Sequence, residues 1–169
     1  MDTIGLGLAL FGGLVQLLLG ITLAVVSIAI GLRILNRVLP DVNVTEALKN
    51  KNVAVGVMSA GVVIAYTKVI STGIVQIGES LSIAPSIGAF IGGILNVLIG
   101  LALASLGVTM AFKALNKVMP SIQIADELNN NNIGVGLFVA GILFGISEMI
   151  AAAVSGIGQA LASVLSNFI

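Results

Sequence analysis

The sequence NVAVG at residues 52–56 begins one long apolar run, and NIGVG at residues 132–136 begins another, 80 positions later. Each run holds a single charged residue, sixteen positions after its opening Asn: Lys68 in the first run and Glu148 in the second. The two runs therefore look like copies of one unit in which an equivalent position carries opposite charges. Because about 20 apolar residues suffice to cross ~30 Å of hydrocarbon, both runs predict membrane-spanning helices.

The composition of the whole chain points the same way. Of its 169 residues 58% are hydrophobic and 8% are charged, with a mean hydropathy of +1.20. Soluble domains carry about 25% charged residues. Apolar and polar residues do not alternate, which argues against a transmembrane β-barrel. The sequence predicts an all-α membrane protein with four transmembrane helices, at about residues 4–32, 53–77, 87–112 and 133–165.

Several chemistries lack the residues that they need. The chain has no Cys and no His, which removes disulfides, thiol redox chemistry, the usual zinc sites and His-based acid–base catalysis. Its net charge of zero leaves no basic surface for nucleic acid. No segment resembles a nucleophile–base pair, a phosphate-binding loop or a metal cluster. We therefore expect no catalytic residue, no metal site and no cofactor, and we do not expect an enzyme.

The apolar runs belong to a longer internal repeat. Placing residues 33–81 over residues 113–161 without a gap gives about 15 identities in 49 pairs. Such self-similarity indicates a tandem duplication with an offset of 80. It divides the chain into two two-span repeats, at 1–81 and 82–169. Because two spans return a chain to its starting side, the repeats should be parallel and related by an axis along the membrane normal.

The positive charges predict the orientation of the chain. Every Lys and Arg except Lys68 lies in one of two polar loops, 33–52 and 113–132. By the positive-inside rule both loops are cytoplasmic and both termini lie outside. Pro40 and Pro120 are expected to end the helices that lead into these loops.

The polar loops contain their own helix signals. Residues 45–48 predict a short helix in the first loop, with Asn43 or Thr45 as its N-cap. Asn52 and Asn132 stand where the next spans begin, and we interpret them as caps that satisfy free backbone N–H groups. The alternative is that these amides form a docking surface for a soluble cytoplasmic protein.

Lys68 and Glu148 are the first candidate site. At 1.5 Å per residue, each lies about 24 Å from the loop edge, near the middle of a tilted span. An unpaired charge at that depth costs at least ~2.5–3.5 kcal/mol. The matched register therefore predicts an intramembrane charge pair that is sheltered from water. The pair would fix the register of the helices or take part in proton or ion movement. Otherwise the two groups snorkel apart or pair with a neighbouring subunit.

Two intramembrane amides, Gln16 and Asn96, are the second candidate site. Each has Gly four residues before and after it, a spacing that places all three residues on one helix stripe where backbones approach closely. We interpret the amides as groups that hydrogen-bond between packed helices. The alternative is that they line the path of a solute. The small residues predicted to pack the helices are Gly12, Gly20, Gly92 and Gly100 around the amides, and Gly56, Ala60, Gly136 and Ala140 in the other spans.

The repeated pattern resembles a known family. Asn-x-x-x-Pro, an acidic stretch, Asn-(Val/Ile)-(Ala/Gly)-Val-Gly and Ala-Gly occur in that order in both 36–61 and 116–141. This pattern is similar to the prokaryotic integral-membrane family called domain of unknown function 350, with its YjfL-like members. The resemblance implies a bacterial or archaeal cytoplasmic membrane protein and no particular activity. It places the acidic loop residues of the family on Glu46 and on Asp126 or Glu127.

A second resemblance is to the duplicated rotor proteolipid of rotary ATPases, which also has four Gly-rich spans and an acid in the fourth. A Lys in the paired register would hold Glu148 ionised, which suits proton pick-up poorly. We therefore expect a self-associating structural or scaffolding component of the lipid bilayer, a homo-oligomer with a cytoplasmic protein partner. The alternative is a small channel or transporter lined by Gln16, Asn96, Lys68 and Glu148.

Overall fold

The computed structural model describes residues 3–82 and 87–168, and every regular element in those ranges is an α-helix. Part of the predicted linker at 80–86 lies outside the described residues. The helices are α1 (Thr3–Val38), α2 (Val44–Lys49), α3 (Val53–Ser82), α4 (Ile87–Val118), α5 (Ile124–Asn129) and α6 (Ile133–Phe168).

Four of these helices are long and apolar enough to cross a membrane. Their apolar stretches are Leu10–Val38, Val53–Gly78, Phe90–Val118 and Ile133–Leu161. The predicted class, an all-α protein with four spans, is confirmed, and the chain is a multi-pass membrane protein.

The first and third long helices extend beyond the predicted spans. The helices continue past Arg33 and Lys113 and end two residues before Pro40 and Pro120. A basic residue does not stop a helix. In the last turn it instead complements the negative end of the helix dipole, and its long stem lets the charge reach the headgroups. The proline is what ends each helix.

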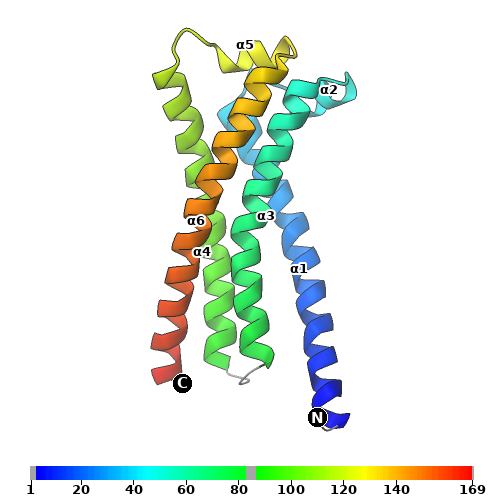
Figure 1. Cartoon of the computed structure of the whole chain (residues 1–169), viewed down its shortest axis with the longest axis vertical. Helices are drawn as coiled ribbons and strands as arrows, with labels where there is room; N and C mark the ends of the chain where they lie inside the picture. The colour runs from blue at the N-terminus through cyan, green and yellow to red at the C-terminus, as the bar shows by residue number, and fades with distance from the viewer. Residues whose placement is uncertain (1–2, 83–86, 169) are drawn as a thin grey trace.

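Both polar loops lie at one end of the bundle, and the first and last helical turns lie at the other (Figure 1). Helices α1 and α4 run toward the loop end, whereas α3 and α6 run back. Helix α3 packs against α1, α4 and α6, and α4 also packs against α6. In the part of the chain that the structure describes, α1 and α6 make at most marginal contact.

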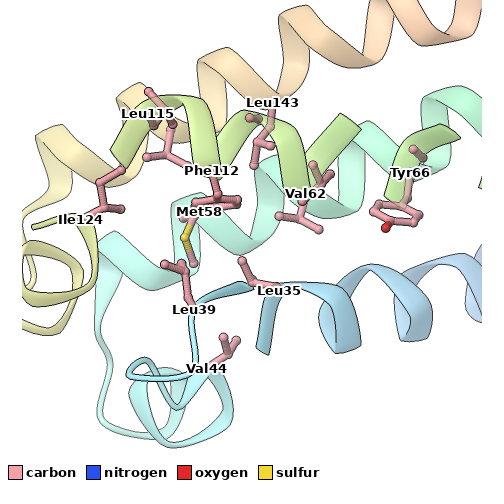
Figure 2. Close-up of a cluster of buried hydrophobic side chains, with 14 of the residues drawn as sticks. Leu35, Leu39, Val44, Met58, Val62, Tyr66, Phe112, Leu115, Ile124 and Leu143 are labelled. Carbon is pink, nitrogen blue, oxygen red and sulfur yellow. The ribbon is translucent and has the colours of Figure 1, made fainter. Parts of the chain in front are cut away.

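The hydrophobic core fills the half of the bundle next to the loops (Figure 2). All four long helices contribute a fully buried side chain to it, for example Leu35, Met58, Phe112 and Leu143. The ring of Tyr66 is also buried, and its hydroxyl donates a 2.9 Å hydrogen bond to Ser105 Oγ. Burying these large side chains holds the loop ends of the helices together.

Helices α3 and α6 approach each other through small residues. A Cβ atom on Gly61 would lie 2.7 Å from Ala140 Cα, and a Cβ atom on Gly136 would meet the carbonyl oxygen of Ala54. Neither position has room for a side chain, so the two backbones are in direct contact.

The two polar loops have the same backbone structure. Asn50 N–H donates to Glu46 O at 2.9 Å, and Asn130 N–H donates to Asp126 O at the same distance 80 positions later. Lys51 and its equivalent Asn131 both have positive φ, 60° and 59°. The predicted N-cap of the first loop helix is confirmed, because Asn43 Oδ1 accepts a 3.1 Å bond from Glu46 N–H.

Candidate functional site

Lys68 of α3 and Glu148 of α6 face each other. Lys68 Nζ lies 3.1 Å from Glu148 Oε1. The pair is not buried within the chain: the two side chains are 47% and 44% exposed on the surface of the bundle. The physical reason is the close approach of α3 and α6 at Gly61 and Ala140, which leaves no room for long side chains between the backbones. The charges meet at the rim of this interface instead.

The amides form a separate polar cluster between α3, α4 and α6. Asn96 is completely buried, and its Nδ2 donates a 2.6 Å hydrogen bond to Gln76 Oε1. Both amides lie against Gly158 of α6, whose missing side chain makes room for them. Asn96 therefore does bond across a helix interface. Its Oδ1 accepts no hydrogen bond among the described residues.

Gln16 makes the corresponding contact in the first repeat. It lies against Gly78 of α3, and Gly78 is the equivalent of Gly158. Gln76 is a further member of the polar cluster that was not predicted from the sequence. The available signal was that Gln76 is the one amide inside the second span. The partner of Gln76 could not be inferred from the repeat, because the position equivalent to Gln76 is Gly156, which has no side chain to pair with it.

The structure does not bring the four polar span residues to one place. Asn96 lies in the interior, whereas Lys68 and Glu148 lie on the surface. Gln16 belongs to α1 and lies against Gly78 of α3. These residues therefore do not line one continuous path within a chain.

The predicted small-residue packing is seen at some positions and not at others. A Cβ atom on Gly100 would lie 3.2 Å from Val69, and Gly136 and Ala140 pack tightly on α3. Gly20 and Gly56 make ordinary van der Waals contacts, and Gly92 is buried. Such packing is not seen within one chain at Gly12, whose Cβ position has nothing within 4 Å among the described residues, or at Ala60, which is exposed. Both hairpins carry the same small residues, but they contact each other through different faces.

The polar loops are bonded to each other at the loop end. Asn52 Nδ2 donates to Leu128 O at 2.8 Å, and Asn131 Oδ1 accepts from Ala54 N–H at 3.0 Å. Asn52 also caps α3, because its Oδ1 accepts a 2.9 Å bond from Val55 N–H. The sequence predicted this cap but not the bonds that join one loop to the other.

The second loop closes in a related way. Asn132 Oδ1 accepts from Val135 N–H at 3.3 Å, so it caps α6, and its Nδ2 donates to Glu127 Oε2 at 2.7 Å. Asp126 is exposed in the first turn of α5. Glu46 lines an open hollow of about 390 Å³ between the loops, beside Asp41 and Asn129. Among the described residues no group of three His, Cys, Asp or Glu could hold a metal ion.

One comparison with known proteins finds a relation. The family model described as Domain of Unknown Function (DUF350) matches residues 9–165, nearly the whole chain. None of the curated proteins or solved structures compared with the chain matches it. The match covers both two-span halves, both polar loops and all the polar span residues discussed above. This multi-pass membrane protein therefore belongs to the DUF350 family.

Proposed function

We propose that the chain is a structural or scaffolding component of a prokaryotic cytoplasmic membrane and that it associates with copies of itself. In this proposal its fold is a tandem duplication of one hairpin, and Lys68 and Glu148 form an intramembrane charge pair that holds the two hairpins in register. Its loops are cytoplasmic and offer a soluble partner a polar surface.

The closed interface between α3 and α6 carries the proposal. A solute path needs a gap between helices, but Gly61 meets Ala140 and Gly136 meets Ala54 backbone to backbone. Nearer the other end of α3, the Cβ position of Gly73 falls on Val97 of α4. Contacts this close suit a rigid spacer in the membrane better than a single-chain channel.

The recurrence of contacts supports the duplication. The amide-on-glycine contact of Gln16 and Gly78 returns as Asn96 and Gly158, at positions shifted by 80. The loop hydrogen bonds and the positive φ angles recur with the same shift. Convergent sequences in apolar helices would not reproduce these polar details together.

The loop end supports a docking role. Asn52, Asn129 and Asn131 fix the two loops to each other, so the loops present one rigid surface. A preformed surface binds a partner without the entropic cost of ordering loops. Six of the seven cations belong to the two polar loops, which by the positive-inside rule supports a cytoplasmic location for this end of the bundle.

One observation favours a second candidate, a small channel or transporter. Lys68 and Glu148 are half exposed, so in an oligomer they could face a shared axis. Gln16 and Asn96 would not join them there, because Asn96 is buried inside each chain. We expect neither catalysis nor a cofactor in either case.

Imaging the purified protein in lipid nanodiscs tests the proposal. Scaffolding predicts an oligomer with helices packed throughout and no leak of ions from proteoliposomes above the level of empty vesicles. A water-filled axis lined by Glu148, together with ion flux that Glu148→Gln abolishes, would instead establish the channel. A monomer in native lipid would contradict self-association.

A further inference from the structure

The outward face of α6 repeats a surface that α3 keeps buried. Met58 and Val69 of α3 are 0% and 1% exposed. Their equivalents in α6, Phe138 and Met149, are 49% and 75% exposed. Helix α3 uses these positions to bind the second hairpin, whereas in α6 nothing in the described chain covers them. Helix α6 therefore presents an uncovered copy of the face through which α3 binds the second hairpin.

If the second hairpin met a further hairpin as the first hairpin meets the second, each residue of the α3–α6 contact would be replaced by its equivalent 80 positions away. Both residues of that shifted contact are uncovered. Within the chain, Gly61 of α3 receives Ala140 of α6. Moving this contact on by one repeat pairs Gly141 of α6 with Ala60 in the first hairpin of another copy. Gly141 has nothing within 4 Å of its Cβ position, and Ala60 is exposed. Both halves of the shifted contact are therefore available.

The shifted equivalent of the α3–α4 contact is open too. Within the chain, Gly93 of α4 lies against Ile77 of α3. The same step pairs Ile157 of α6 with Gly13 of α1 in the next copy. Ile157 is 37% exposed, against 2% for Ile77, and Gly13 has nothing within 4 Å of its Cβ position.

The two charged residues can also form the shifted contact. The in-chain pair is Lys68 with Glu148, and the shifted pair is Glu148 with Lys68 of the next copy. Each side chain is nearly half exposed, so each can meet a second opposite charge. Opposite charges at equivalent positions are what a repeated step requires, because every contact between neighbouring hairpins then joins a cation to an anion.

We propose that copies of this chain associate head to tail, with α6 of one copy packing against α3 and α1 of the next as α3 packs against α6 and α4 within a chain. This proposal rests on the self-association proposed above and adds its interface and direction. Lys68 meets the residue of its own register, so neighbouring hairpins sit at one depth and the repeated step stays in the membrane plane. The contact is heterologous and builds a closed ring or an open row.

The packing within the chain argues against a two-fold alternative. A two-fold relation between the hairpins would pair α6 with α1 whenever it pairs α3 with α4. The structure packs α3 against α4 but leaves α1 and α6 with at most marginal contact in the described ranges. The step from one hairpin to the next is therefore open, and α6 remains available to a further hairpin.

Disulfide trapping in native membranes tests the interface, because the chain has no Cys of its own. Ala60→Cys and Gly141→Cys chains with different tags are co-expressed and then oxidised. We expect cross-linking between the two variants to exceed cross-linking within either variant by at least ten-fold. Met110→Cys in place of Gly141→Cys is the control, since Met110 is 67% exposed and a similar number of residues from the loop end, but on α4.

The other outcomes overturn the proposal in distinguishable ways. Gly141→Cys cross-linking mainly to itself would mean that α6 packs on α6. Equal cross-linking of the Met110→Cys control would mean random collision. An oligomer without the expected cross-link would refute this interface and leave self-association standing. A monomer in native lipid would refute both.

A bulky substitution gives a second readout that does not depend on oxidation. Gly141→Leu points into open space within a chain, so the monomer should fold, and we expect at least a ten-fold loss of oligomer by native mass spectrometry in lipid nanodiscs. Gly7→Leu is the control, because Gly7 also has nothing within 4 Å of its Cβ position but lies six residues from Gly13, about 120° away around α1. Unchanged assembly of Gly141→Leu would contradict the proposal.

Discussion

Removing one member of the Lys68–Glu148 pair should destabilise the fold more than removing both. The test compares Lys68→Met, Glu148→Leu and the double variant with the natural chain. Each single variant leaves one charge without its partner at 3.1 Å. The double variant leaves two apolar side chains, which suit the surrounding lipid and helices.

The expected size follows from depth and exposure. Lys68 lies fifteen residues into α3, which is about 22 Å from the loop end at 1.5 Å per residue. A single charge near the middle of a span costs ~2.5–3.5 kcal/mol on insertion scales. Because the pair is nearly half exposed, a stranded side chain recovers part of this cost by bending toward the headgroups. We expect each single variant to lose ~2 kcal/mol and the double variant to lose less than ~1 kcal/mol.

Reversible unfolding in bicelles, at dilutions where the protein is monomeric, measures these free energies. The coupling energy from the double-mutant cycle is the quantity of interest, and the losses expected above make it about 3 kcal/mol. Lys113→Met combined with Glu148→Leu is the control cycle, because Lys113 lies near the loop end of α4. That cycle should be additive within ~0.5 kcal/mol. Additivity in the Lys68–Glu148 cycle as well would refute direct pairing.

Further predictions concern packing, capping and orientation. Gly136→Ala should cost ~1–3 kcal/mol in the same unfolding assay, because its methyl group would meet the backbone of Ala54. Gly141→Ala should be neutral or slightly stabilising in the monomer, and equal losses in the two variants would contradict the described α3–α6 interface. Asn52→Ala should cost ~1–2 kcal/mol and speed amide exchange where the two loops join, since it removes both a cap and the 2.8 Å bond to Leu128 O. Asn132→Ala is the control and should leave amide exchange at the junction of the two loops unchanged, because the Asn132 side chain bonds to Glu127 of its own loop and to Val135 of α6. A reporter fused to the C-terminus should be active only on the outer side of the membrane, and activity on the cytoplasmic side would reverse the predicted topology.

Much of the fold could be predicted because the membrane restricts the choices. Backbone polar groups must be satisfied within each span, so apolar length alone indicates helices. The Asn residues that open the runs indicated where α3 and α6 begin, and the prolines indicated where α1 and α4 end. The matched register of Lys68 and Glu148 predicted that they pair, and in the structure their charged atoms lie 3.1 Å apart. The sequence left open that the two groups snorkel apart or pair with a neighbouring subunit.

The relative placement of the hairpins could not be predicted. The same small residues occur in both repeats, so the sequence does not say which copy of a face is covered. For this reason the sequence did not predict that Gly136 packs tightly while Gly141 is open, or that the charge pair lies on the surface of the bundle. Gln76 was missed for a related reason, because its partner Asn96 belongs to the other repeat and only the fold brings the two together.

The distance of 80 residues between Lys68 and Glu148 also has a consequence during synthesis. At about 5–20 residues per second, a ribosome needs about 4–16 s to travel from one codon to the other. The second span thus reaches the bilayer carrying an ammonium group whose counter-ion does not yet exist. Until the fourth span arrives, the nascent hairpin must stay beside the insertion machinery, lean its lysine toward the surface, or be sheltered by a finished neighbour.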